Sequence, residues 1–397
     1  MIFATYWFFA FAALFLPVFW LLRNKSARLV WLLGACVIFH AHYAGPAGVL
    51  PIIVIGIITY FAGLSRHRTV CLLAIAVCVG ALCFYKYSIF FFSNVFGQIS
   101  PAVGRIASEW AKNVLPQAPP LGISFFAFEF VHYLYDVREG TPPLRNFFQF
   151  TAFSIFFPSL VAGPIKRYEQ FIPSLKDGLA KVNAQDSVVG IVQVAFGYLK
   201  KVVADNLTLY LDAYQDQFAD LHLDQRWVLF TAIAFRILFD FSGYSDIAIG
   251  LARMMGIRLP PNFNWPYFAT SIQTFWQRWH MSLSSWIRDY VYIPLGGSRH
   301  GQARRILNGV VAFGLCGLWH GAAWNFVIWG LYHGIGLGVC ASYRHLPFGV
   351  GKTLERVLSK LKPINWFLTQ AFVWLGWLLF FYPVDKALKM ARLLFAI

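Results

Sequence analysis

Two histidines lie in strongly apolar stretches, a setting that suits acid–base chemistry. In GLCGLWHGAAWNFVIWGLYHG, residues 314–334, His320 and His333 are the only histidine, acidic or basic side chains. An imidazole in such surroundings is expected to be neutral at pH 7, so it can accept a proton as a general base. A hydrogen bond between helices explains His320 equally well, and for His333 we favour that structural role.

His280 belongs to a second polar cluster, FWQRWHMSLSSWIRDYVYIPLGGSR, at residues 275–299. Read as one helix, the segment has two polar faces, made of Gln277, His280, Ser284 and Arg288 and of Arg278, Ser282, Ser285 and Asp289, with Trp276 among the apolar residues between them. A helix with two polar faces cannot lie against lipid. We therefore expect the segment to be buried in protein or to be re-entrant along an aqueous chamber.

A third polar cluster follows one side of the apolar run at 227–255. Read as a helix, its residues fall within half of the circumference: Arg236, Asp240, Gly243, Asp246, Gly250 and Arg253. Arg236 and Asp240 are four residues apart and can pair directly. For Arg236, Asp240 and Asp246 we favour a structural polar strip that holds helices together over a direct part in catalysis.

The composition requires that these clusters be carried by membrane helices. Of the 397 residues, 58% are hydrophobic and only 13% are charged, whereas soluble domains have roughly 25% charged residues. Soluble enzyme folds are therefore excluded. Because a helix crosses a bilayer in about 20 residues, the length allows on the order of eleven to thirteen crossings, some of them re-entrant. We predict an all-α, polytopic helical bundle that forms a single domain over residues 1–397.

The expected crossings follow the apolar runs of the sequence. We read Phe3–Leu22 as a retained first helix, because no charged segment precedes it and no small-residue cleavage site follows it. The further runs lie at about 29–42, 47–64, 69–92, 121–137, 147–163, 188–203, 227–255, 266–295, 305–344 and 364–384.

Basic residues between the runs predict the orientation of the first helices. Cations at 23–28 and 66–68 belong on the cytoplasmic side, which places the N-terminus outside and the segment 136–145 inside. The alternation fails after Gly163, because four basic residues at 166–181 fall where an outer loop is expected. We assign no sides beyond that point.

Several function classes lack the residues that they need. The net charge of +16 arises from cations that lie between apolar runs, where orientation and lipid contact explain them without nucleic acid. The six cysteines form no C-x-x-C or His/Cys cluster, so we expect no metal site and no disulfide framework. There is also no G-x-S-x-G elbow, P-loop or H-E-x-x-H. A histidine that acts on two bound substrates fits better.

At these residues the sequence resembles the membrane-bound O-acyltransferase (MBOAT) family, and within it the alginate and peptidoglycan O-acetylation branch. The branch that transfers D-alanine to teichoic acid is similar through DFSGYSD, NFN and RWHMSLS. The stretches that carry the resemblance are PLGISFFAFEFVHYLYDVREG, FPSLVAGPIKRY, GYLKKVVADN, FDFSGYSDIAIGLARMMG, PNFNWPY, FWQRWHMSLSSWIRDYVYIPLGGSR and GLWHGAAWNFVIWGLYHG.

The resemblance implies a helical bundle around a central tunnel, with His320 as the catalytic histidine and His280 as the second one. It also implies a reaction in which an acyl group, normally acetyl, passes from a cytoplasmic thioester such as acetyl-CoA to a hydroxyl of an extracytoplasmic polysaccharide. We expect no permanently bound cofactor. Arg278, Asp289, Asn325 and Trp276 are candidate substrate-binding residues, and an extracytoplasmic SGNH-type esterase or transferase is the expected partner. The expected location is the bacterial inner membrane, with many passes.

Three alternatives remain open at this point. The first is D-alanyl transfer to teichoic acid. The second is a transporter or flippase in which the strip at 236–246 lines a path and the histidines relay protons. The third is a structural subunit of a polysaccharide secretion complex.

Overall fold

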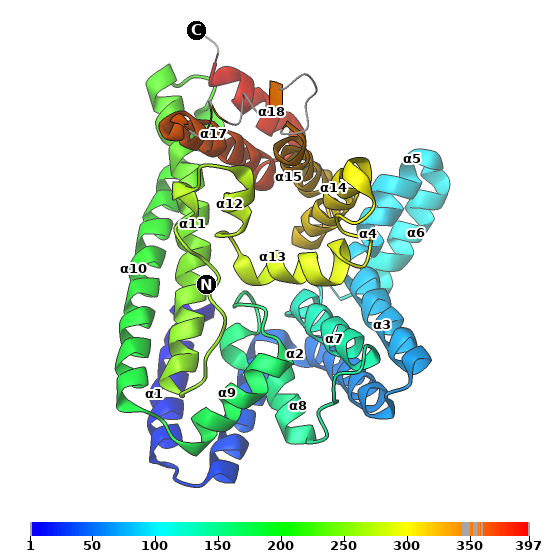
Figure 1. The fold of residues 1–397 in the computed structure, drawn as a ribbon, viewed down its shortest axis with the longest axis vertical. Coiled ribbons are helices and arrows are strands. Elements are labelled where there is room, and N and C mark those ends of the chain that lie inside the picture. Colours follow the sequence, from blue (N-terminus) through cyan, green and yellow to red (C-terminus); the bar gives the residue numbers. More distant parts are fainter. Residues whose placement is uncertain are drawn as a thin grey trace. The chain divides into compact units, whose positions relative to one another are not determined.

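The computed structural model describes residues 2–116, 118–343, 350–351, 356, 358 and 360–395, which contain helices and no strand. The chain divides into two compact units, which we describe separately (Figure 1). The first unit comprises Met1–Tyr198 and Tyr244–Pro260, and the second comprises Leu199–Gly243 and Pro261–Ile397. The all-helical class is confirmed, and the single domain over residues 1–397 stays a prediction.

The first unit contains most of the N-terminal helices. They are α1 (Tyr6–Leu21), α2 (Lys25–Ser65), α3 (Arg68–Leu82), α4 (Ser88–Phe90), α5 (Gly97–Ile99), α6 (Pro101–Val114), α7 (Ile123–Arg138), α8 (Phe147–Ser154), α9 (Tyr168–Ala180) and the start of α10 (Ala184–Tyr214). Helix α2 contains a kink at Gly45, where a left-handed φ of 63° is followed by a second helical stretch. Glycine adopts this conformation without the steric penalty of a side chain.

The second unit contains the elements that carry both candidate histidines. They are most of α11 (Leu223–Met254), α12 (Ile272–Trp276), α13 (Met281–Ile287), α14 (Gly301–His320), α15 (Trp324–Ser342), α17 (Lys362–Phe381) and α18 (Val384–Leu393). A π-helical turn, Arg288–Tyr292, follows α13 directly. Helices α14 and α15 form a closely packed antiparallel pair (Figure 1).

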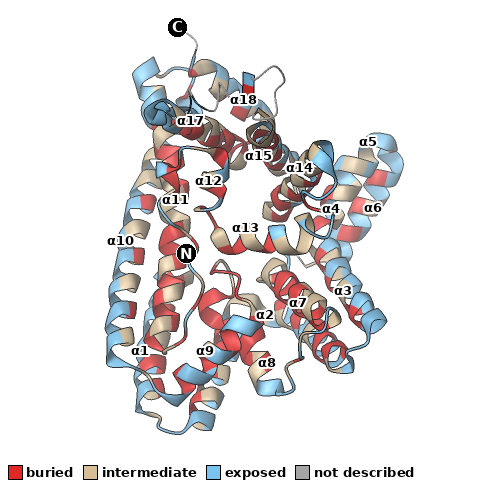
Figure 2. Ribbon diagram, in the orientation of Figure 1, coloured by how far each residue is buried: buried red, intermediate tan, exposed pale blue. Residues whose placement is uncertain are grey.

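Five helical segments within the described residues are long and apolar enough to cross a membrane. They are Lys25–Ser65, Arg68–Ile99, Ala184–Gln217, Leu223–Met254 and Lys362–Phe381. Large apolar side chains on these helices, such as Leu73, Phe196 and Phe367, are more than half exposed, as expected of surfaces that face lipid (Figure 2). The protein is a multi-pass membrane protein, although the five segments are fewer than the eleven to thirteen crossings expected from length.

Broken helices explain part of this difference. The run expected at 266–295 consists of two helices of five and seven residues and a π-helical turn. The run expected at 147–163 contains only α8, with eight residues, and a three-residue 3-10 turn. A crossing needs about 20 helical residues, so neither run spans a bilayer as one helix. Apolar composition alone does not distinguish such re-entrant segments from true crossings.

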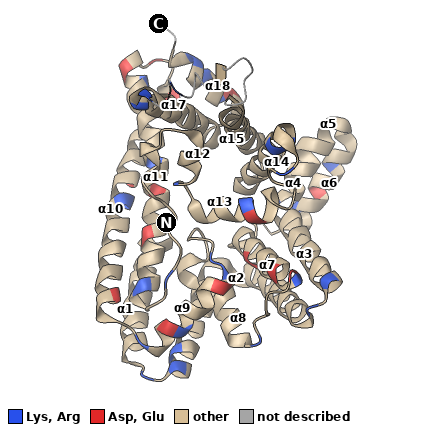
Figure 3. Ribbon diagram, in the orientation of Figure 1, with Lys and Arg blue, Asp and Glu red and all other residues tan. Residues whose placement is uncertain are grey.

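The shortness of the 147–163 segment also accounts for the failure of the charge alternation after Gly163. The guanidinium of Arg28, at the start of α2, donates a hydrogen bond to the carbonyl of Leu179 in α9 at 3.2 Å. The indole of Trp20, at the end of α1, donates to the carbonyl of Met254 at 2.8 Å. Helix α9 therefore lies at the same end of the first unit as the basic α1–α2 turn, which the positive-inside rule places in the cytoplasm. Few charged residues lie elsewhere along α1 and α2 (Figure 3).

Candidate active site

His280 lies at a break between two short helices rather than within one. It caps α13 with a left-handed φ of 42°, a conformation that is strained for a residue with a side chain and that concentrates at functional sites. The interpretation of the segment at residues 275–299 as one helix is therefore wrong at this point. Because the chain bends at His280, the two polar faces expected of one helix do not form.

The His280 side chain is 1% exposed, and neither ring nitrogen has a hydrogen-bond partner among the described residues. Its ring packs edge-on against Phe241 of α11, with 4.6 Å between centroids. Burying unpartnered polar nitrogens and holding a strained backbone both reduce stability. This combination is more typical of a functional position than of a histidine kept for packing.

A hydrogen-bonded turn holds the strained backbone at His280. The Asn262 carboxamide oxygen accepts hydrogen bonds from the hydroxyl of Ser282 at 2.8 Å and from its backbone N–H at 3.3 Å. The Asn262 carbonyl accepts from the Met281 N–H at 2.9 Å, and the Arg278 carbonyl accepts from the Asn264 N–H at 2.9 Å. Sequence reasoning assigned no role to Asn262, although it lies in the PNFN motif; its side chain positions the turn rather than a substrate.

His320 is the last residue of α14 and is only partly buried, unlike His280. Three aromatic rings surround it, those of Trp319, Trp329 and Phe380, with centroids 4.8–5.2 Å from the imidazole. The C-terminal end of a helix carries partial negative charge, which stabilises an imidazolium formed there. His320 is therefore more exposed than His280 and lies where the helix end favours positive charge.

Glycines set the position of His320 through the α14–α15 contact. A Cβ atom at Gly317 would meet the carbonyl oxygen of Phe326 at less than a normal contact distance and the Cα of Gly330 at 3.0 Å. A Cβ at Gly334 would meet the Cα of Val310 at 2.8 Å. These small residues let the two helix backbones approach closely.

The two histidines lie together in the second unit. Their ring centroids are 6.4 Å apart. His280 lies outside the five candidate membrane spans, and burial, reinforced by the neighbouring His320, lowers the pKa of its imidazole well below the usual value. His280 is therefore neutral and shielded, while His320 is the more exposed member of the pair.

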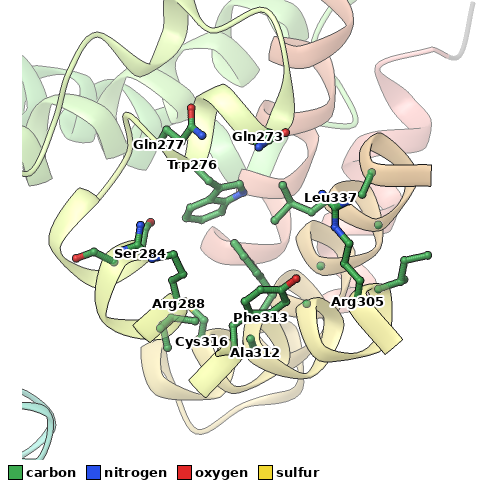
Figure 4. Close-up of a pocket in the computed structure, with 18 of the residues that line it drawn as sticks. Gln273, Trp276, Gln277, Ser284, Arg288, Arg305, Ala312, Phe313, Cys316 and Leu337 are labelled. Carbon is green, nitrogen blue, oxygen red and sulfur yellow. The ribbon is translucent and has the colours of Figure 1, made fainter. Parts of the chain in front are cut away.

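A cavity of about 480 Å³ opens beside this pair in the second unit (Figure 4). Trp276 and Phe313 line it, with 4.8 Å between their ring centroids, and Arg305 contributes positive charge, while Arg288, which also lines it, pairs with Asp289. Neither histidine lines the cavity. Trp276 contacts Trp329 at 5.7 Å, and Trp329 contacts His320 at 5.2 Å, so an aromatic wall separates the cavity from the catalytic candidate.

The structure places the other candidate substrate-binding residues differently. Asp289 pairs with the neighbouring Arg288 at 2.7 Å. The amide of Asn325 donates to the carbonyl of Leu379 at 3.1 Å, which ties α15 to α17. Trp276 lines the cavity, whereas the side chain of Arg278, which is partly exposed, does not. Arg305 also lines the cavity, and sequence reasoning missed it because it lies outside the polar clusters.

The residues of the polar strip on α11 face α10. In the second unit, Lys201 pairs with Asp240 at 2.9 Å and also with Asp205, and Arg236 lies 3.8 Å from Asp240. In the first unit, the amide of Gln193 donates to the carboxylate of Asp246 at 3.4 Å. These contacts join α10 and α11, as expected of a structural polar strip that holds helices together.

Comparison with known proteins identifies the family. The model of the membrane-bound O-acyltransferase (MBOAT) family matches residues 136–347, more than half of the chain. The chain belongs to this family. It is 34% identical to the peptidoglycan O-acetyltransferase of Helicobacter pylori over 93% of this chain and 74% of that protein. It is 37% identical to the probable alginate O-acetylase AlgI of Azotobacter vinelandii, over 70% of this chain but only 54% of that protein.

A more distant MBOAT relative is the teichoic acid D-alanyltransferase of Bacillus subtilis, which is 31% identical over 55% of this chain and 60% of that protein. The matched family region includes both histidines, the cavity and the Asn262 turn. The protein is thus a membrane acyltransferase, and the resemblance seen in the sequence is confirmed.

Proposed function

We propose that this MBOAT protein transfers an acetyl group from a cytoplasmic thioester to a hydroxyl of an extracytoplasmic polysaccharide, in the bacterial inner membrane. The single observation that supports it is the pairing of a reachable histidine, His320, with a buried and strained one, His280, within an aromatic shell. The names of the relatives, a peptidoglycan O-acetyltransferase and an alginate O-acetylase, agree with it.

In the proposed reaction, His320 takes the proton from the acceptor hydroxyl as its oxygen attacks the thioester carbonyl. The new C–O bond forms, the C–S bond breaks, and the proton passes to the departing thiolate. The α14 C-terminus stabilises the intermediate imidazolium, and the aromatic shell keeps water from the thioester. His280 acts as a positioning residue, because its ring is shielded. A central tunnel would let donor and acceptor meet from opposite sides.

The cavity suits the donor, whether it is acetyl-CoA or an acyl carrier protein. Both carry an apolar arm and a phosphate, and the cavity combines apolar walls with Arg288 and Arg305. The thioester would reach His320 past Trp276 and Trp329. An SGNH-type partner outside the membrane would complete transfer to the polymer.

The test compares His320→Ala with the exposed-site control His222→Ala in purified full-length protein, with acetyl-CoA and a soluble sugar acceptor. We expect free CoA release to fall by at least about 10²-fold in His320→Ala, the lower end of general acid–base contributions, and to be unchanged in the control. Wild-type CoA release by His320→Ala would refute the role of His320. Release only from a D-alanyl carrier protein would select the teichoic acid alternative, and no thioester cleavage at all would favour a transporter.

A further inference from the structure

Helix α6, in the first unit, has three faces of different character. Its apolar stripe, begun by the residue two positions before the helix, consists of side chains that are each more than half exposed: Ile99, Val103, Ile106, Trp110 and Val114. A second face carries exposed charges, on Arg105, Glu109 and Lys112. The third face is buried and consists of Gly104, Ser108 and Ala111. At about 100° per residue, the apolar stripe and the charged face flank the buried face on opposite sides.

The buried face packs against the end of the helical segment that precedes α6. A Cβ at Gly104 would lie 3.0 Å from the carbonyl oxygen of Phe92 and at less than a normal contact distance from the Cα of Gly97. The Trp110 ring lies 6.5 Å from that of Phe92 and 6.4 Å from that of Phe84. Helix α6 therefore turns back and runs alongside residues 84–97 (Figure 1).

The segment beside α6 is a candidate membrane span, Arg68–Ile99. Arg66 and Arg68 place its start in the cytoplasm, so Ile99 lies at the outer end. A helical segment of 32 residues is about 48 Å long. At an average tilt it crosses about 45 Å, which matches the thickness of a bilayer with its head groups. The part beside α6 is therefore at the level of the outer head groups and the adjoining acyl chains.

A contact with α7 indicates the same level. The ammonium of Lys86 donates a hydrogen bond to the hydroxyl of Ser124, in the first turn of α7, at 3.2 Å. Arg138 and Arg145, at and beyond the other end of α7, place that end in the cytoplasm. Residues beyond Lys86 therefore begin near the outer boundary of the hydrocarbon core, and α6 lies alongside them.

Lipid accounts for all three faces of α6. The apolar stripe continues the exposed apolar surface of the span, which includes Val77, Ile89 and Phe96. Tryptophan, here Trp110, is enriched at the boundary between lipid and water. The exposed charges oppose immersion of the whole helix in hydrocarbon. An apolar stripe combined with a charged face is typical of helices that lie in the membrane interface.

We propose that α6 is an interfacial helix that binds the outer leaflet of the membrane, independently of the acyl transfer proposed above. The apolar stripe contacts phospholipid acyl chains, and the charged face lies among head groups and water. Because Gly104 fits closely against Gly97 and Phe92, this contact with lipid holds the outer end of the span at a fixed depth.

The test uses full-length protein in phosphatidylcholine vesicles, with a nitroxide spin label on one cysteine. The background variant Cys83→Ser/Cys340→Ser removes the two thiols that are not buried. Ile106→Cys places the label on the apolar stripe. Arg105→Cys, the matched control, places it on the charged face of the same helical turn. Power saturation then measures collisions with oxygen, which concentrates among acyl chains, and with a water-soluble nickel chelate.

We expect oxygen collisions to exceed nickel collisions severalfold at Ile106→Cys, and the reverse at Arg105→Cys. Val103→Cys repeats the measurement if Ile106→Cys does not fold. Dominant nickel collisions at both positions would show that the stripe faces water, and few collisions with either reagent at Ile106→Cys would show that protein covers it. Dominant oxygen collisions at both positions would place the whole helix in hydrocarbon. Each of these three results would overturn the proposal, and none bears on the role of His320.

Discussion

Substitution of Gly330 by alanine tests whether the α14–α15 contact positions the catalytic histidine. A Cβ at Gly330 would lie 3.0 Å from the carbonyl carbon of Phe313 and 3.1 Å from the Cα of Gly317, with the Phe313 oxygen closer still. Ordinary contacts begin near 3.4 Å. The helices must therefore separate by at least several tenths of an ångström, because the atoms in conflict are backbone.

The stability and activity effects of Gly330→Ala differ in size. Overpacking costs about 1–3 kcal/mol, and the better helix propensity of alanine returns about 1 kcal/mol. We thus expect a net loss of up to about 2 kcal/mol. Activity should fall further, because Gly330 follows Trp329, whose ring contacts His320. A misplacement of about 1 Å can reduce turnover about 10²-fold.

The assay pairs thermal unfolding in detergent with acetyl-CoA turnover. Gly80→Ala in α3 is the matched control, since its Cβ would meet nothing within 4 Å. We expect the control to keep wild-type turnover. If Gly330→Ala unfolds and turns over like Gly80→Ala, the close helix contact does not position His320 and the reasoning is refuted.

Three further predictions concern the turn at His280 and the polar strip. Asn262→Ala removes two hydrogen bonds that the side chain accepts in the turn, and it should destabilise the protein by about 1–3 kcal/mol. It should also lower kcat more than it raises KM. A change in KM alone would contradict the prediction. Because burial lowers the pKa of His280 in the folded protein, the unfolded chain binds more protons than the folded protein below about pH 6.5. This residue therefore makes the free energy of unfolding fall as pH drops from about 7.5 to about 5.5. His280→Asn should reduce that fall, which chemical unfolding at both pH values measures. Lys201→Met leaves Asp240 without one of its partners and should reduce stability by roughly 1 kcal/mol, since the carboxylate is one-third exposed; unchanged thermal unfolding would show that the pair contributes nothing.

Much of the fold followed from the sequence because its signals are local. Low charge and long apolar runs predicted membrane helices. The i,i+4 spacing of Arg236 and Asp240 predicted their proximity, but not the part of Lys201, which comes from another helix. Periodicity describes one helix and contains no information about the helix that it faces.

The candidate site was harder to predict from the sequence than the fold, because it depends on contacts between distant segments. The polar faces at 275–289 were derived from a continuous helix, but His280 breaks it with a φ of 42°. That conformation depends on the hydrogen bonds that the Asn262 side chain accepts from Ser282. Asn262 lies 18 residues before His280, so local pattern contains no information about this contact. Sequence reasoning assigned Asn262 no role, and only the structure gives it one.

The contrast between His280 and His333 shows why burial alone does not identify a functional histidine. Both are buried with no hydrogen-bond partner for either ring nitrogen among the described residues. His333, however, lies within the regular helix α15, and its ring contacts those of Trp276, Trp329 and Trp377. His280 adds a strained backbone, a hydrogen-bonded turn that maintains it, and a second imidazole beside it. A strained conformation is retained only where the surroundings enforce it, and here they hold the His280 ring with its centroid 6.4 Å from that of His320.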